Sequence, residues 1–287
     1  MTDTSLKAPA AAPHTGDPRP LPSVGAVLWL AWFSFREMVR RKRLFGLSAI
    51  NLIPVLVVLA IRIWAKDLGI SPHLQLAGLT HDIFIEFLIP IAAMAMAIPA
   101  IGEQVDDGTI VFTWTRPVQR WAIYLGRLLA AQVVSTVVMS GALVLCFLIM
   151  VSEGTGVITF EFLKVYMVTF LIIALGAFTY SALFAAMGTF FRKPVLPAIL
   201  FTFGWESMVS NIPARVQEVS LRFHLQNLIE RPPAAPQDLP GVLEALLSTA
   251  FVRDPVPKVQ SIAVLLVVTA LATLLGAWLL KHKEIEK

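Results

Sequence analysis

Apolar residues along this chain are gathered into blocks, and charged residues and turn formers separate one block from the next. Six blocks are long enough to cross a bilayer, for which a helix needs about 20 mostly apolar residues. They cover residues 44–64, 83–101, 121–151, 162–191, 195–212 and 261–280. Because lipid offers the backbone no hydrogen-bond partners, these blocks must be helices. The pattern predicts an all-α polytopic membrane protein with six transmembrane helices.

A different pattern precedes the first block. From Val24 to Val39 apolar side chains recur at helical spacing, and the basic run Arg40-Arg41-Lys42-Arg43 follows. We interpret residues 23–43 as an amphipathic helix at the membrane interface, with aromatic residues toward lipid and cations toward anionic headgroups. The alternative is an extension of the first span, although four cations inside hydrocarbon are costly. The domain division is then a disordered tail (1–22), this helix (23–43) and a transmembrane domain (44–287).

Composition excludes several classes of protein. Hydrophobic residues make up 57% of the chain and charged residues only 15%, whereas soluble domains carry about 25% charged residues. A soluble enzyme is therefore excluded. The single cysteine, Cys146, cannot form an intrachain disulfide, and the five histidines lack the spacing of metal ligands, so we expect no metal site. The net charge of +4 is expected to reflect membrane topology, and no nucleic-acid partner is expected.

The basic residues predict the orientation of the chain. With a cytoplasmic N-terminus, 15 of the 23 basic residues fall on the inner side, and five of the other eight lie in one long loop. Short cytoplasmic loops are the segments that carry excess Lys and Arg. We therefore expect a multi-pass protein of the cell's inner (cytoplasmic) membrane with both termini in the cytoplasm.

An external helical insert is predicted between the last two spans, at residues 213–258. Ala214 to Ile229 is expected to be one helix, and a second amphipathic helix follows. The second helix shows apolar residues at helical spacing, namely Leu243, Leu246, Leu247, Ala250 and Phe251. These helices either cover the exit of a pathway or form a packed cap with no role beyond stability.

An acidic residue lies inside the fifth block. Glu206 follows Val195 by 11 residues, which places it roughly mid-membrane at about 1.5 Å per residue. Acids at such depth are functional candidates. We interpret Glu206, with Ser207 and Asn211, as candidate lining of a translocation path. The alternative is a protonated glutamate that bonds across a helix or subunit interface.

No catalytic motif accompanies these features. The chain lacks the GxxxxGK[ST] phosphate loop, the HExxH pair and the GxSxG elbow, so an enzyme is not predicted. The loop at 102–120 is dense in charge, and its Asp107-Gly108-Thr109 turn places Thr109 as an N-cap. Such a loop suits docking to a soluble partner, and an ordinary charged loop explains it equally well.

The residues of this loop resemble a known signature. The pattern Glu103, Gly108-Thr109, Arg116-Pro117, Arg120 and Gly126 is similar to that of ABC type-2 permeases, the membrane subunits of ABC exporters. The resemblance extends over nearly the whole chain. Thr115 stands where the family often has Ser, and Asp106-Asp107 replaces a common glutamate.

The resemblance implies partners and residue roles. Residues 103–120 would be the segment that couples to a separate cytoplasmic ABC ATPase, and residues 24–43 a connecting helix that also touches the ATPase. The coupling residues would be Glu103, Asp106, Asp107, Gly108, Thr109, Arg116, Pro117 and Arg120, and the connecting-helix residues Arg36, Arg40, Arg41 and Arg43. The chain would bind no cofactor itself, because ATP and Mg²⁺ belong to the ATPase.

The resemblance also implies an assembly and a direction of transport. Two permease subunits, identical or not, would form a twelve-helix dimer among the membrane lipids and move substrate outward. Two other functions stay open. One is an ion-coupled secondary transporter that uses Glu206, and the other is a non-transporting membrane scaffold of the same fold.

Overall fold

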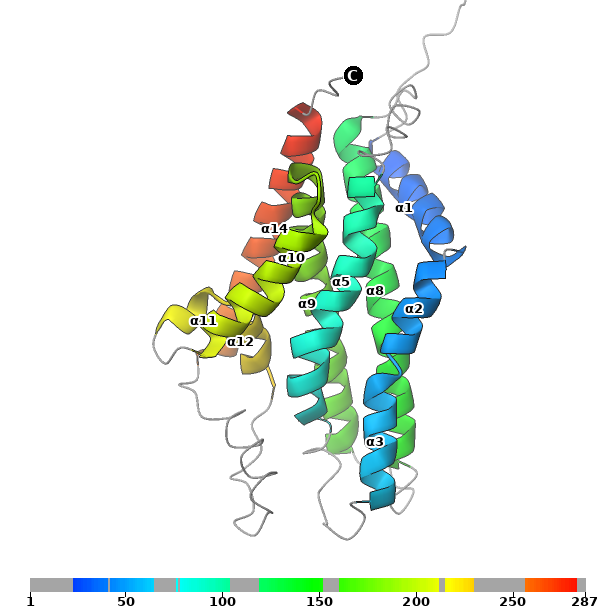
Figure 1. Ribbon diagram of the computed structural model, residues 1–287, viewed down its shortest axis with the longest axis vertical. Helices are drawn as coiled ribbons and strands as arrows, with labels where there is room; N and C mark the ends of the chain where they lie inside the picture. Colours follow the sequence, from blue (N-terminus) through cyan, green and yellow to red (C-terminus); the bar gives the residue numbers. More distant parts are fainter. Residues whose placement is uncertain are drawn as a thin grey trace, which may run out of the picture.

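Helices make up the part of the chain that the structure describes. The computed structural model describes residues 23–40, 42–64, 76, 78–103, 119–151, 160–211, 215–229 and 256–282. These residues form helices and short turns without any strand, which confirms the all-α prediction (Figure 1). The predicted tail at 1–22, loop residues 104–118 and residues 230–255 of the predicted insert lie outside the described residues.

The predicted N-terminal amphipathic helix is present as α1 (Ser23–Arg40). Its apolar face, which includes Leu30, is buried against α8 (Arg120–Val151). The two helices approach closely at Gly126 of α8, where a Cβ atom would lie 2.7 Å from the Cβ atom of Leu30. Any side chain at position 126 would therefore push α1 away from α8.

The first predicted span consists of two helices, α2 (Lys42–Ile50) and α3 (Ile53–Trp64). A short turn separates them, and there the side-chain amide of Asn51 donates to the carbonyl oxygen of Leu47 at 2.9 Å. Pro54 follows at once, and a proline has no backbone N–H to continue the helical ladder. The pair is nevertheless apolar and long enough to cross a membrane.

The second predicted span changes its helical winding twice. It begins as η2 (Thr80–Leu88), continues as α5 (Ile89–Ile98) and ends as η3 (Pro99–Glu103). Both η segments have the wider winding of a π-helix. Each change of winding falls at or beside a proline, Pro90 or Pro99, which is where a helix is expected to lose a hydrogen bond and adjust.

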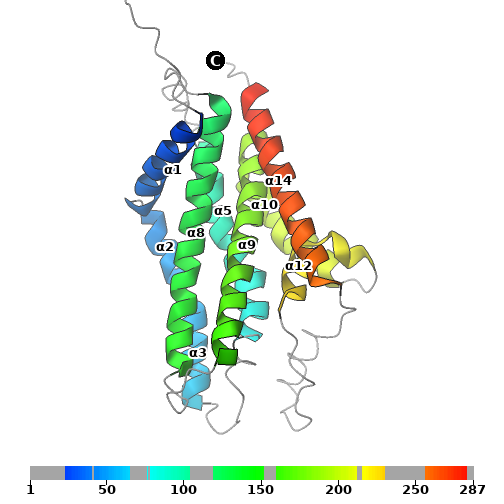
Figure 2. The same ribbon diagram turned by 180° about the vertical axis from the view of Figure 1, so that it is seen from behind.

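Three long helices form the rest of the bundle. They are α8, α9 (Phe160–Phe190) and α14 (Lys258–His282), and each ends within a few residues of its predicted bounds. Helix α9 lies centrally and packs on α5, α8 and α14 (Figure 2). A hydrogen bond of 2.9 Å from the Thr269 hydroxyl to the Thr179 hydroxyl joins α14 to α9.

Small residues allow the close packing of α9. Ala177, Ser181 and Ala185, spaced four apart, are all completely buried. At Gly176, the residue before Ala177, a Cβ atom would lie 2.9 Å from a methyl group of Ile89. Because lipid tails are as apolar as side chains, such tight van der Waals contact is what holds membrane helices together.

The fifth predicted span is bent and short. It comprises α10 (Val195–Ile199), η4 (Leu200–Glu206) and α11 (Ser207–Asn211), and α11 turns away from the bundle axis (Figure 1). Its winding changes from α to π after Ile199 and back to α after Glu206. Its apolar part, Val195–Ser210, is shorter than a membrane-spanning helix, whereas five other described helices are long and apolar enough. Five of the six predicted spans are therefore long and apolar enough to be candidate membrane spans.

The first helix of the predicted insert is divided in two. Residues 215–219 form the short helix η5 (Arg215–Val219), and α12 (Leu221–Asn227) follows. Ser220 between them has an extended backbone, with φ −82° and ψ 130°, so one continuous helix from 214 to 229 was a wrong prediction. Helix α12 packs against α14 and η2. The second predicted helix lies outside the described residues.

Candidate functional site

The predicted coupling segment is described only at its two ends. Glu103 is the last residue of η3, and Arg120 is the first residue of α8. Six of the predicted coupling residues lie outside the described residues: Asp106, Asp107, Gly108, Thr109, Arg116 and Pro117. The structure therefore reports how the segment is anchored to the bundle.

The entry to this segment is held against two neighbouring helices. Arg127 of α8 is only 8% exposed, and its guanidinium donates to the carbonyl oxygen of Ala100 at 3.0 Å. On another side Gly102 packs against α9 so closely that a Cβ atom would lie 3.3 Å from the carbonyl oxygen of Gly188. The residues that lead into the segment are thus fixed to both α8 and α9.

The exit from the segment is tied to the last helix. Arg120 is exposed, and its guanidinium donates to the carbonyl oxygen of Lys281 at 3.2 Å. Lys281 lies in the last turn of α14, where a cation meets the negative end of the helix dipole. Next to it the indole N–H of Trp121 donates to the side-chain oxygen of Gln119. The two ends of the segment therefore contact α8, α9 and α14.

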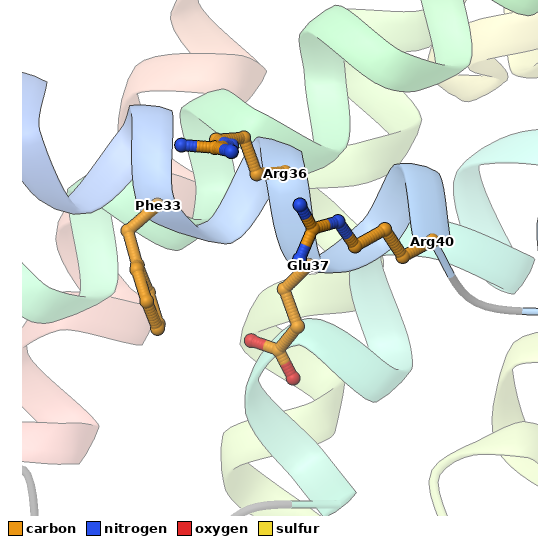
Figure 3. A pocket seen from close by; sticks show the side chains of 4 residues that line it. All are labelled: Phe33, Arg36, Glu37 and Arg40. Atoms are coloured by element: carbon orange, nitrogen blue, oxygen red, sulfur yellow. The ribbon is translucent and has the colours of Figure 1, made fainter.

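The predicted connecting helix exposes its basic residues. Arg36 and Arg40 are exposed on α1. Together with Phe33 and Glu37 they border a groove of about 490 Å³, shown in Figure 3. Arg41 and the side chain of Arg43 lie outside the described residues.

Glu206 is buried and bonded to the start of α12. The residue is 2% exposed, and its carboxylate accepts three hydrogen bonds. The donors are the hydroxyl of Ser220 at 2.6 Å and the backbone nitrogens of Leu221 at 3.1 Å and Arg222 at 3.0 Å. The first N–H groups of a helix have no partner within the helix, and its N-terminus favours a negative charge. Glu206 thus caps α12 from a distant part of the chain.

Two further side chains surround this carboxylate. The hydroxyl of Tyr180 in α9 hydrogen-bonds Glu206. The guanidinium of Arg222 turns to Glu86 of η2, with 2.7 Å between its nitrogen and the Glu86 oxygen. Because a buried charge is tolerated only when it is paired and hydrogen-bonded, these contacts explain how Glu206 can be buried. We call Glu86, Tyr180, Glu206, Ser220 and Arg222 the Glu206 cluster.

The opposite end of α12 is bonded to α14. His224 is 1% exposed, and its Nε2 atom lies 2.8 Å from the carbonyl oxygen of Glu218. A carbonyl oxygen only accepts, so Nε2 carries the proton, and Nδ1 faces the hydroxyl of Ser261 at 3.1 Å. The amide of Asn227 donates to the same hydroxyl at 3.0 Å and to the carbonyl oxygen of Val256 at 2.7 Å. Helix α12 is thus joined to the second, fifth and last apolar segments.

The predicted path residues are not gathered around an opening in the described structure. Glu206 faces α12, Ser207 is half-buried, and the side chain of Asn211 lies outside the described residues. Their neighbours Trp205 and Met208 are 51% and 70% exposed on the outside of the bundle. The role of Glu206, Ser207 and Asn211 in a translocation path stays a prediction.

Sequence reasoning missed the partners of Glu206. The predicted site residues do not include Tyr180, Ser220 or Arg222. Only Ser220 has a local signal, because serine is a typical N-cap, whose hydroxyl accepts from the backbone nitrogen three residues later. Its hydroxyl indeed accepts from the Phe223 nitrogen at 3.3 Å. Within the described ranges no three His, Cys, Asp or Glu side chains are grouped as a metal site.

A comparison with models of protein families assigns the chain to a family. The model of the ABC-2 family transporter proteins matches residues 28–285, which include α1 from Leu28 onward, all the described spans and the segment 103–120. A comparison with curated proteins gave no match. Members of the ABC-2 family are membrane components of transporters, and the apolar helices described above agree with that role. The chain belongs to the ABC-2 transporter family and is a transmembrane permease.

Proposed function

We propose that this permease is the membrane subunit of an ATP-driven exporter and that a separate cytoplasmic ABC ATPase drives it. ATP and Mg²⁺ would be bound by that ATPase, and this chain would bind no cofactor of its own. The observation that carries the proposal is the anchoring of the coupling segment 103–120. Ala100 and Gly102 just before it, and Arg120 at its end, contact helices of the bundle.

The anchoring supplies a route for mechanical coupling. A push on the segment reaches α8 and α9 through Arg127 and Gly102, and α14 through Arg120. Packed helices transmit displacements as rigid elements. ATP-driven closure of the ATPase would therefore shift several helices together, and substrate would leave toward the outside.

The topology belongs to the same proposal. Both termini lie on the cytoplasmic side of the inner membrane, as the distribution of 15 of the 23 basic residues indicates. The fifth crossing, which is shorter than the other five, is made by the bent segment 195–211, and α12 fills the outer half of the bilayer beside it. The hydrogen bonds from α12 to Glu206 and Ser261 support this arrangement.

A second permease subunit completes the assembly. The bent segment exposes Leu196 at 67%, Leu200 at 63% and Met208 at 70%. A helix that packs so little within its own subunit can use this face for another subunit or for lipid. We propose that a second subunit, identical or not, packs here.

Secondary transport is less well supported. A coupling acid must exchange protons or ions with water, whereas three donors already occupy the Glu206 carboxylate. No particular observation favours a non-transporting scaffold.

Two changes in the coupling segment, a charge reversal and a proline substitution, test the function. Glu103→Arg and Gly108→Pro should abolish capture of the ATPase and the rise in its hydrolysis rate when the permease is added. Glu218→Arg, an equal charge change at an exposed residue of η5, is the control and should leave both unchanged. Normal capture and normal hydrolysis in both variants would contradict the proposal.

A further inference from the structure

The outward face of α1 is covered by no described residue and is unusually aromatic. Trp29, Trp32 and Phe33 are 52%, 61% and 53% exposed. The rings of Trp29 and Phe33 stack with their centroids 5.8 Å apart and their planes 10° from parallel. Tryptophan is enriched where a protein meets the boundary between lipid and water, because its ring is both apolar and a hydrogen-bond donor.

Two arginines continue this face toward the first span. Arg36 and Arg40 are both exposed and lie one turn apart, about 6 Å along the axis by helical rise. With Phe33 and Glu37 they border the groove of about 490 Å³ in Figure 3, where the Arg40 side chain folds back along the helix toward Glu37. Two arginine side chains that start one turn apart on the same face can both reach the oxygens of one phosphate group.

The groove lies close to the start of the first membrane span. Helix α1 is followed by α2, and the membrane-spanning stretch starts at Leu44, one turn beyond Arg40. The groove therefore lies where the chain enters the membrane. Residues 36–43 contain five cations and one carboxylate, so this region attracts anions.

We propose that this groove binds an anionic phospholipid of the adjoining leaflet. The phosphate of the headgroup lies between Arg36 and Arg40, and the stacked rings of Trp29 and Phe33 lie beside the same headgroup. A soluble phosphate would use the arginines but not the exposed rings. The inference is independent of the ATPase and adds a lipid site to the transporter.

Native mass spectrometry tests the site with the full-length protein. The protein is incubated with equal amounts of phosphatidylglycerol and phosphatidylcholine, and the lipids that it retains are counted. The test variant is Arg36→Gln with Arg40→Gln. The control variant, Arg192→Gln with Lys193→Gln, removes the same charge from exposed residues between α9 and α10.

The proposal predicts that the wild type and the control prefer phosphatidylglycerol and that the test variant loses this preference. The loss should be about fivefold for each cation removed. Equal retention of the two lipids by the wild type would overturn the proposal, and so would an equal loss in the control. If the test variant keeps its preference but no longer captures the ATPase, the groove is a protein-docking surface and the lipid site is wrong.

Discussion

The carboxylate of Glu206 and the backbone nitrogen of Arg222 lie 3.0 Å apart, and the guanidinium of the same arginine lies 2.7 Å from Glu86. One residue therefore bonds to the fifth apolar segment through its backbone and to the second span through its side chain. The acid that the sequence places inside the membrane is used here to hold α12 in position.

Glu206→Gln should lower the melting temperature of the purified protein. A carboxamide offers one oxygen where the carboxylate offers two, so its NH₂ group would face a backbone N–H of α12. Leaving such a buried donor unsatisfied costs about 1–3 kcal/mol. Glu218→Gln, at an exposed position, is the control and should change the melting temperature little.

Transport measurements separate this structural role from a role in the path. If Glu206 only holds α12, transport by reconstituted vesicles should fall no further than the amount of folded protein. A larger fall, with the melting temperature unchanged, would support the path role and contradict the structural one.

Glu86 and Arg222 should be energetically coupled. Glu86→Gln and Arg222→Gln each leave one charge in a partly or fully buried place, whereas the double variant removes both. We expect the double variant to be more stable than the sum of the single effects by about 1 kcal/mol. Strictly additive losses of stability in denaturation experiments would show that the ion pair contributes nothing.

Two glycines of α8 should respond in opposite directions to alanine. Gly126→Ala places a Cβ atom 2.7 Å from Leu30 and should loosen α1, at a cost of about 1–3 kcal/mol. Gly141 has open space around it, so Gly141→Ala should stabilise the helix by up to about 1 kcal/mol. A melting temperature that is unchanged or raised in Gly126→Ala would rule out the close approach of α1 and α8.

Replacing each of two buried tyrosines by phenylalanine should have different effects on the melting temperature. The hydroxyl of Tyr124 has no hydrogen-bond partner among the described residues, whereas that of Tyr180 bonds Glu206. Removal of an unpartnered buried hydroxyl is neutral or stabilising, and removal of a bonded one costs about 1 kcal/mol. Tyr124→Phe should therefore keep or raise the melting temperature, and Tyr180→Phe should lower it. If Tyr124→Phe lowered the melting temperature and Tyr180→Phe kept or raised it, the result would contradict the Glu206 cluster.

The bundle could be predicted from the sequence because its signal is local. A long apolar run such as 121–151 indicates by itself a helix surrounded by lipid. The observed α8 begins one residue before this run and ends at the same residue. The length of the fifth segment could not be predicted in this way. Its residues count as apolar up to position 212, but its winding changes at Leu200 and again at Ser207. Glu206, between these two points, bonds to backbone nitrogens of α12, and no local pattern in the sequence indicates that contact.

The Glu206 cluster could not be predicted for a different reason. Depth was calculated from helical rise, which places a residue along an axis but does not identify its partners. Ser220 and Arg222 follow Glu206 by 14 and 16 residues, beyond the periodicity of any one helix. Tyr180 belongs to another span, and nothing in an apolar run marks one tyrosine as the neighbour of a distant acid.

Cross-linking in cells tests most directly whether a separate ATPase contacts this permease through residues 103–119. A photo-activatable amino acid is placed at Thr109, and a second variant carries it at Glu218 of η5 as the control. We predict that the adduct at position 109 contains a protein with the GxxxxGK[ST] phosphate loop and that the adduct at 218 does not. The same ATPase at both positions, or none at 109 while the permease is folded and present in the membrane, would contradict the account.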